Sequence, residues 1–308
     1  RSEIIKDYRK NNKELYPAVY SNINYSHNLF IDDKQLHTLG GISNVVSVTS
    51  NEGGEYQIYK SDRYGFNNPN EVHDNDKLQI GIVGDSFMQG NCVKREHTLG
   101  GVISEKFPKT LTIASAGNGS LSNLASLIEY LSDKEPEVVL WFFYAGNDLI
   151  EQNSEREQFS TLRKYLEEKN FKQNLNLYQK EIDEHLIAIT EKESPNNLKS
   201  KIREIVLFFA LKPLLSELTT ITFKIIKKIS PNVSSNVNNQ IIQVDPQYER
   251  EYLIKVLLRA REIVEKWSGT FITVYIPYQT EMFLTQTPDH FLITNKIFYE
   301  LMEKNNIN

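Results

Sequence analysis

Short continuous runs of apolar residues recur along this chain and alternate with segments of helical periodicity. Apolar runs bounded by glycine or other turn residues are typical of strands that are buried on both faces of a parallel sheet. The alternation predicts an α/β fold, with a mainly parallel sheet and helices on both of its faces. The buried strands are expected at Leu78–Val83, Leu111–Ala116, Val138–Tyr144 and Thr270–Ile276.

Helical periodicity fills most of the remaining sequence after residue 96. The segment from residue 150 to 268 has no strand signal, and we interpret it as a helical insertion in which the Asn- and Ser-rich run 231–240 is a loop. Helices are expected at His97–Phe107, Leu121–Leu131, Glu155–Lys169, Leu175–Lys192, Lys199–Lys228, Tyr248–Trp267 and Phe291–Lys304.

The first 76 residues differ from the rest because they are polar and rich in turn residues. We interpret residues 1–76 as an extension packed on an α/β domain of residues 77–308, with short strands at Val45–Thr49 and Tyr56–Tyr59. The chain begins at Arg1 rather than Met, so we expect that it is trimmed at its N-terminus, where a targeting segment could have been lost.

Composition and charge limit the classes of partner. The chain has 308 residues, of which 40% are hydrophobic and 24% charged, as in an ordinary globular protein. A net charge of −5 gives no reason to expect nucleic acid or an anionic membrane as partner. The single cysteine, Cys92, excludes an internal disulfide and a cysteine-based zinc site. His27, His37, His73 and His97 lack metal-ligand spacing, so no metal or other cofactor is expected.

One segment raises the question of a membrane. The apolar stretch Ile205–Ile226 carries Lys212, Pro213 and Glu217 near its middle, which disfavours a spanning helix. We expect a kinked helix that is buried against the domain or lies on a membrane surface. The second alternative implies membrane proximity and favours the cell envelope or periplasm over the cytoplasm.

Candidate functional residues follow the ends of the first three predicted strands. Ser86 follows the first strand, Gly117 the second and Asn147 the third. Because ligands of open parallel sheets bind beyond the carboxyl ends of the strands, these residues are expected to meet at one edge. A serine nucleophile beside backbone N–H groups and a side-chain amide suits acyl transfer, in which donors must stabilise an oxyanion.

The same three segments resemble the GDSL/SGNH hydrolase family. Gly84-Asp85-Ser86-Phe87 is similar to the family's first block, Gly117 to the second-block glycine, and Gly146-Asn147-Asp148 to the third block, in the same order. The run 61–69 and the strand Val139–Tyr144 further resemble a bacterial subgroup associated with envelope or polysaccharide modification. The resemblance implies a three-layer α/β/α, flavodoxin-like fold, with Ser86 as nucleophile and with Gly117 and Asn147 as oxyanion donors.

Taken singly, each element has a plainer interpretation. The turn that contains Ser86 could have no catalytic role, Asn147 could be a helix N-cap, and Gly117 could simply bend a loop. We expect Asp85 to brace the turn rather than to do chemistry. The G-x-S-x-G motif of α/β-hydrolases is not met, because Met88 occupies the position of its second glycine. A phosphate-binding loop is also excluded, because no Gly-Lys-Ser/Thr follows the strand.

The general base is missing from its expected place. The family has an Asp and, three residues later, a His in its last block, but no such pair follows Asn147. His185 falls in the helical insertion, and His290 follows Asp289 directly, so it misses the spacing. We therefore expect the catalytic His and Asp downstream of Asn308, with His290 as the alternative base.

The resemblance implies an esterase or deacetylase acting through a seryl ester on Ser86. An O-acetyltransferase acting on an envelope polysaccharide and a non-catalytic binding protein on the same scaffold remain the alternatives. The substrate would be an acyl ester or an O-acetylated glycan, and the insertion would form much of its pocket.

Overall fold

The structure of the protein is a computed structural model that describes Ile5 and residues 14–20, 29–31, 33–51, 54–192, 245–278 and 293–308. Nearly all of these residues belong to one compact unit, Glu3–Ala188 with Asp245–Asn308, whereas Ile189–Val244 form a second unit. Within the described ranges, no helix is long and apolar enough to cross a membrane. Several predicted features lie outside the described residues: the helix Lys199–Lys228, the stretch Ile205–Ile226, the loop 231–240, His27 and His290.

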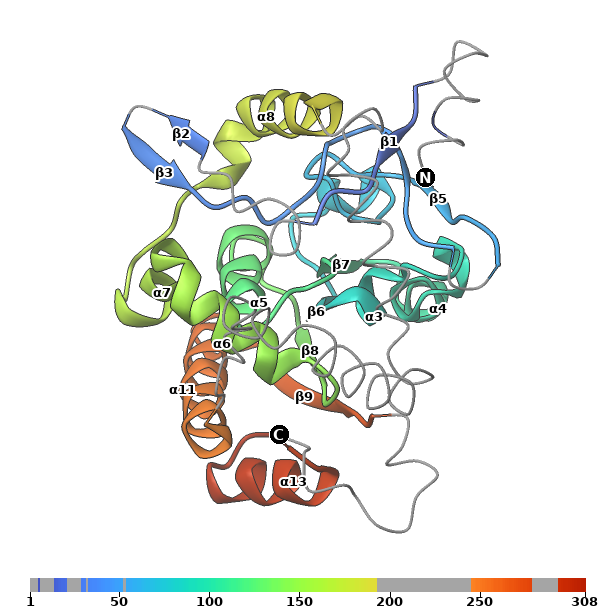
Figure 1. The fold of residues 1–308 in the computed structure, drawn as a ribbon. Coiled ribbons are helices and arrows are strands. Elements are labelled where there is room, and N and C mark those ends of the chain that lie inside the picture. Colours follow the sequence, from blue (N-terminus) through green and yellow to red (C-terminus); the bar gives the residue numbers. More distant parts are fainter. Residues whose placement is uncertain are drawn as a thin grey trace, which may run out of the picture. The chain divides into compact units, whose positions relative to one another are not determined.

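A four-stranded, all-parallel sheet forms the centre of the larger unit (Figure 1). Its order is β7-β6-β8-β9, so the chain places β7 on one side of β6 and then crosses to the other side for β8. The α/β prediction is confirmed, and each buried strand lies where an apolar run predicted it. The strands are β6 (Ile80–Gly84), β7 (Thr110–Ala114), β8 (Val138–Tyr144) and β9 (Thr270–Ile276).

Alternate strand residues point to two separate hydrophobic clusters, as the two-residue period of a strand requires. Val83 and Trp141 pack with α5 and α11, whereas Ile82 and Phe142 pack with Met88 of α3. Each such fully buried side chain contributes about 1.5–3 kcal/mol to folding. The predicted placement of helices on both faces is therefore confirmed. The helices are α3 (Ser86–Gln89), α4 (Leu99–Lys106, after the 3-10 turn Arg95–His97), α5 (Ser120–Ser126, continued by the π-turn Leu127–Leu131) and α11 (Pro246–Glu265).

The helix expected at Glu155–Lys169 was wrong in its bounds. The chain instead forms α6 (Asp148–Gln158) and α7 (Ser160–Glu167), separated by Phe159 in an extended conformation. The start of α6 was missed because its inner face buries polar residues, which leave no apolar periodicity to detect. Two further predicted helices, Leu175–Lys192 and Phe291–Lys304, are present as α8 (Gln179–Lys192, after the 3-10 turn Leu175–Tyr178) and α13 (Asn295–Lys304).

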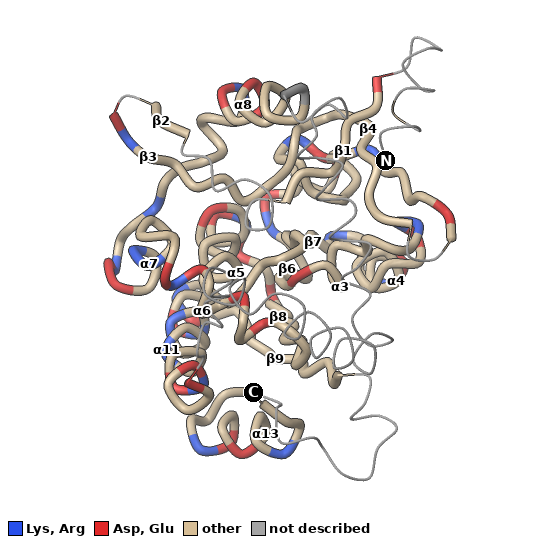
Figure 2. Tube along the Cα trace, viewed as in Figure 1, with Lys and Arg blue, Asp and Glu red and all other residues tan. Residues whose placement is uncertain are grey.

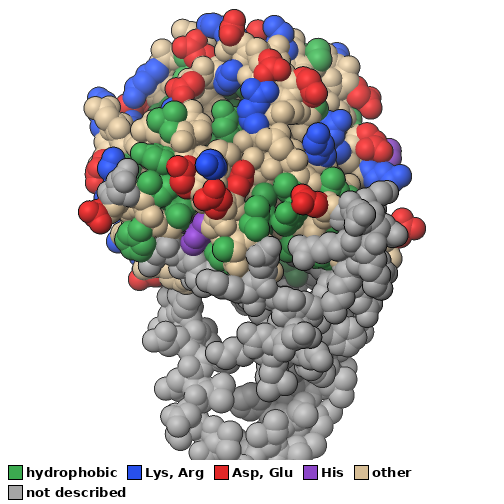
Figure 3. Space-filling view, turned by 90° about the horizontal axis from the view of Figure 1, so that it is seen from above, with side chains coloured by type: hydrophobic (Ala, Val, Ile, Leu, Met, Phe, Trp, Pro, Cys, Tyr) green, Lys and Arg blue, Asp and Glu red, His purple; other side chains and the backbone are tan. Residues whose placement is uncertain are grey.

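Residues of both charge signs alternate along α11 and α13 (Figure 2). Ion pairs between successive turns join Arg261 to Glu265 and Lys296 to Glu300. Acidic and basic side chains are also interspersed over the face in Figure 3. Exposed pairs of this kind contribute little stability, about 0–1 kcal/mol each, and serve mainly solubility.

The N-terminal region adds short strands to the same unit. β1 (Tyr16–Pro17), β4 (Val46–Val48) and β5 (Ile58–Lys60) form a three-stranded sheet, and β2 (Leu29–Ile31) pairs with β3 (Lys34–Leu36). Two short strands were predicted here, and β4 and β5 confirm them with small shifts.

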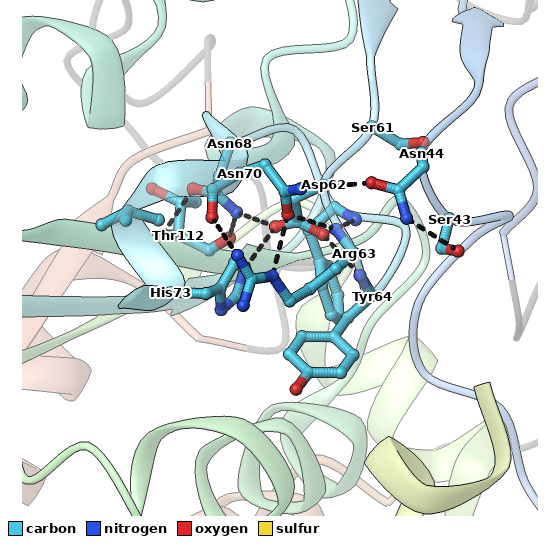
Figure 4. Close-up of polar contacts among 12 residues, drawn as sticks. Ser43, Asn44, Ser61, Asp62, Arg63, Tyr64, Asn68, Asn70, His73 and Thr112 are labelled. Atoms are coloured by element: carbon cyan, nitrogen blue, oxygen red, sulfur yellow. Dashed lines mark hydrogen bonds and ion pairs between the residues drawn. The ribbon is translucent and has the colours of Figure 1, made fainter. Parts of the chain in front are cut away.

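A buried carboxylate organises the turn that follows β5 (Figure 4). Asp62 is fully buried, and its Oδ1 accepts hydrogen bonds from the backbone N–H groups of Tyr64 and Phe66, both at 2.9 Å. Its Oδ2 accepts from Asn68 Nδ2 at 2.8 Å and pairs with His73 Nε2 at 2.9 Å. The turn is therefore built around one carboxylate with four partners, and His73 is a structural residue.

The same turn also covers β7, the outermost strand of the central sheet. Asn68 Nδ2 donates to the carbonyl of Thr112 at 2.8 Å, and Asn68 Oδ1 accepts from the N–H of Thr112 at 3.0 Å. Thr112 belongs to β7, the edge strand, so the amide takes the place of a neighbouring strand. Asn67 Nδ2 also donates to the carbonyl of Gln89 at the end of α3. The extension thereby supports the loops at the end of the sheet.

Candidate active site

Ser86, Gly117 and Asn147 all follow strands that end at the same edge of the sheet (Figure 1). The structure therefore brings the three predicted site residues to one end of the fold. β6 and β8 are neighbours, and between them the chain reverses its direction of travel across the sheet. Such a switch point opens a crevice beyond the carboxyl ends of the strands, where ligands of α/β proteins bind.

Ser86 is the first residue of the short helix α3, and its side chain is partly exposed. Asp85 precedes it and is buried, and its Oδ1 accepts a hydrogen bond from the N–H of Phe87 at 3.0 Å. The Ser86 hydroxyl makes a long hydrogen bond to Asp85 Oδ2, at 3.5 Å. Asp85 thus braces the turn, as expected, and presents the hydroxyl beyond the end of β6.

The loop after β7 is tied to the neighbouring strand and helix. Gly117 has a φ of +82°, a left-handed conformation that favours glycine. The N–H of Ala116 donates to Gln89 Oε1 at 2.8 Å, and Asn118 Nδ2 donates to the carbonyl of Gly84 at 3.4 Å. These contacts hold the Gly117 backbone beside the start of α3.

Gly119 in this loop is required by close packing rather than by its backbone angles. A Cβ at this position would lie 2.5 Å from the backbone nitrogen of Gln152 and 2.7 Å from Glu155 Oε2. The loop therefore lies directly against α6, the helix that Asn147 precedes.

Asn147 occupies the N-cap position of α6, but its side chain makes no capping hydrogen bond. Its Oδ1 is buried and has no hydrogen-bond partner among the described residues. The neighbouring Asp148 instead bonds to the backbone, since its Oδ2 accepts from the N–H of Tyr144 at 2.9 Å. Asn147 is therefore the N-cap residue by position, as the plainer interpretation expected, but its side chain does not cap the helix and hydrogen-bonds to Glu151 instead.

Carboxyl groups gather around Ser86. Burial raises the pKa of Asp85 to about 6. Burial, reinforced by the charge of Asp85, raises the pKa of Glu151 to about 7 and that of Asp148 well above its ordinary value. The raised pKa values favour the neutral form of these carboxyl groups and so reduce the negative charge beside Ser86. When ionised, they would stabilise a cation, such as an imidazolium, beside Ser86.

An aromatic rim lies next to the candidate nucleophile. Phe87 is 50% exposed, and its ring centroid is 4.3 Å from that of Tyr144 at the end of β8. Tyr278, which follows β9, lies 6.3 Å from Tyr144 between ring centroids. The ends of β6, β8 and β9 thus contribute one apolar surface on which a substrate could rest.

No described histidine is bonded to Ser86. His73 pairs with Asp62, His37 packs against Phe159, His97 is exposed in the turn before α4, and His185 belongs to α8. The described ranges also contain no group of three or more His, Cys, Asp or Glu side chains that could hold a metal ion.

Comparison with known proteins gives no match. No protein-family model, curated protein or solved structure matches this chain. The assignment of a function therefore rests on the residues and on their geometry.

Sequence reasoning missed one residue that shapes this site. Glu155 of α6 is buried and accepts hydrogen bonds from backbone N–H groups of the loop after β7 and of the first turn of α5, although 33 to 36 residues separate it from its partners. Burial raises the pKa of Glu155 to about 7 in spite of these bonds. The only signal in the sequence was a helical segment unusually rich in polar residues, which does not distinguish a buried carboxylate from an exposed one.

Proposed function

We propose that this protein is a serine-nucleophile ester hydrolase of the SGNH type. The observation that carries the proposal is that Ser86, the Gly117 loop and Asn147 share one sheet edge, where hydrogen bonds fix the surrounding loops. The order of the sheet, with the first strand between the second and the third, agrees with the flavodoxin-like arrangement of such a fold.

In the proposed reaction the Ser86 hydroxyl attacks the carbonyl carbon of an ester and gives its proton to a general base. The tetrahedral oxyanion accepts hydrogen bonds from the N–H groups of Ser86 and Gly117 and from the side-chain amide of Asn147. The intermediate collapses when the alkoxide leaves, taking the proton from the base. Water, activated by the same base, then releases the acid and restores the serine.

The base is proposed to be a histidine outside the described residues. The resemblance to SGNH hydrolases places it in a later block, and His290 is the alternative within this chain. The carboxyl groups of Asp85 and Glu151 support a histidine base, because they would stabilise its protonated form.

Replacing Asn147 by alanine is expected to lower kcat by about 10²–10³-fold with little change in KM. One oxyanion donor would be lost, and the donor acts mainly in the transition state. Steady-state hydrolysis of p-nitrophenyl acetate by the full-length protein measures the effect. Asn153→Ala, in the same helix, is the matched control, because Asn153 bonds to Arg156 rather than facing the sheet edge. Equal kcat values for the two variants would contradict the role of Asn147.

Replacing Phe87 by alanine is expected to raise KM about 5-fold for esters with a phenyl or long alkyl acyl group, and to leave acetyl esters unaffected. The change removes an apolar contact of about 1 kcal/mol. A series of p-nitrophenyl esters of increasing chain length measures it. Phe107→Ala serves as the control, because Phe107 is also exposed but lies at the end of α4. The same KM shift for every chain length would refute a role in acyl binding.

Hydrolysis and acyl transfer are separated by one experiment. The full-length protein is incubated with p-nitrophenyl acetate, with and without an oligosaccharide acceptor, and nitrophenol release and acetylated glycan are both measured. Release that is independent of the acceptor supports the hydrolase. Release that depends on the acceptor, with acetylated product, would identify an O-acetyltransferase. The folded protein could release no nitrophenol with or without the acceptor, and could also leave the acetyl groups of an O-acetylated oligosaccharide in place. That result would refute the catalytic proposal and leave the alternative of a binding protein.

A further inference from the structure

Glu155 links the loop after β7 to the helix after β8. Its side chain is 1% exposed. Oε1 accepts a hydrogen bond from the N–H of Gly119 at 2.8 Å, and Oε2 accepts from the N–H groups of Leu121 and Ser122 at 2.9 and 3.2 Å. These donors include the unpaired N–H groups that every helix start exposes, here the start of α5. One carboxylate therefore fixes the path of the chain from the loop into α5.

The helix that supplies this carboxylate also follows the second oxyanion donor. Asn147 stands at the N-terminus of α6, and Glu155 lies about two turns later in the same helix. Because the intervening helix is stiff, the carboxylate ties the loop carrying Gly117 to the element carrying Asn147. A parallel bond from Ser120 Oγ to Gln152 Oε1, at 2.6 Å, joins the same two elements.

We propose that Glu155 is a positioning residue that sets the spacing between the two oxyanion donors, the N–H of Gly117 and the amide of Asn147. This inference rests on the proposed function. Oxyanion donors must lie about 2.7–3.1 Å from the developing charge. A displacement of about 1 Å far from the chemistry can cost about 10²-fold in rate.

The three hydrogen bonds that Glu155 accepts require a carboxylate, because a neutral polar side chain of the same size cannot accept all of them. Three backbone N–H groups need acceptors on both oxygens, and an amide offers an acceptor on only one side. In Glu155→Gln the NH₂ group must therefore face at least one backbone N–H. The variant keeps the size of the side chain and removes one anchor, so a local displacement of the loop is expected.

The test compares Glu155→Gln with Glu129→Gln in the full-length protein at pH 8. Glu129 is an equally buried carboxylate with three hydrogen bonds, from Tyr165, Gln173 and Leu175, none of them in the loop after β7. For Glu155→Gln we expect kcat to fall about 10²-fold with KM changed less than about 2-fold. For Glu129→Gln we expect both constants to stay near those of the wild type, provided that urea unfolding shows each variant to be folded.

Two further readouts separate positioning from a merely structural role. In the Asn147→Ala background the kcat loss from Glu155→Gln should shrink to about 10-fold, because the spacing of two donors no longer matters when one is absent. Amide hydrogen exchange in a peptide covering residues 115–123 should quicken at least about 10-fold in Glu155→Gln and not in Glu129→Gln.

An unchanged kcat, a full 10²-fold loss in the Asn147→Ala background, or unchanged exchange in residues 115–123 would each overturn the inference. A wild-type protein without ester turnover would instead refute the proposed function, and with it the catalytic part of this inference. Hydrogen exchange would still decide whether Glu155 anchors the loop, so the two failures are distinguishable.

Discussion

Ser86→Ala is expected to reduce ester turnover by roughly 10⁴–10⁶-fold, because without the hydroxyl no seryl ester can form. The fold should be unaffected. The hydroxyl is partly exposed and makes only a 3.5 Å hydrogen bond to Asp85, whose bond to the N–H of Phe87 stays in place. Hydrolysis of p-nitrophenyl acetate by the full-length protein measures the loss.

Ser160→Ala is the matched control for this substitution. Ser160 is also the first residue of a helix, α7, and it is exposed. The Ser160→Ala variant should hydrolyse p-nitrophenyl acetate at the wild-type rate. If Ser86→Ala kept more than about a tenth of the wild-type kcat, the measured activity would belong to another group and the assignment of Ser86 would be wrong.

The second large effect is expected on stability rather than on rate. Asp62→Ala should lower the free energy of unfolding by about 3–5 kcal/mol, because it removes a hydrogen-bond acceptor from four partners, of which Phe66, Asn68 and His73 are buried. The loss should also loosen the contact of Asn68 with β7, since Asp62 holds the Asn68 amide from the other side. Urea unfolding at 25 °C, followed by circular dichroism, measures the difference.

Asp74→Ala provides the comparison within the same turn. Asp74 forms a 2.6 Å ion pair with Arg63, but its side chain is 64% exposed. A pair in water contributes at most about 1 kcal/mol, so this variant should unfold almost as the wild type does. Similar losses for the two variants would show that the buried network around Asp62 does not stabilise the fold as described.

The central sheet was the part of the fold that the sequence made predictable. Strands such as Ile80–Gly84 and Thr110–Ala114 are buried on both faces and lie in unbroken apolar or small-residue runs. Their parallel arrangement also made the meeting of Ser86, Gly117 and Asn147 at one edge predictable, because carboxyl ends of parallel strands share an edge.

Polar burial accounts for most of what could not be predicted. α6 was placed seven residues too late because its inner face carries Gln152, Asn153 and Glu155 instead of apolar residues. The pairing of Asp62 with His73 was missed because a buried carboxylate in a polar turn looks, in sequence, like an exposed one. The partners of Glu155 lie 33 to 36 residues away, whereas those of Asp62 lie within 11 residues but give no apolar pattern. The general base stays a prediction, since the histidine expected for it is not among the described residues.

The central claim is that Ser86 is an activated nucleophile, and covalent labelling tests it most directly. The full-length protein is treated with a fluorophosphonate, and the adduct is measured by intact mass and located by peptide mapping, with Ser86→Ala and Ser160→Ala alongside. We predict one adduct per chain on the peptide containing Ser86, lost in Ser86→Ala and retained in Ser160→Ala. No adduct on folded wild-type protein, or an adduct that persists in Ser86→Ala, would contradict the account.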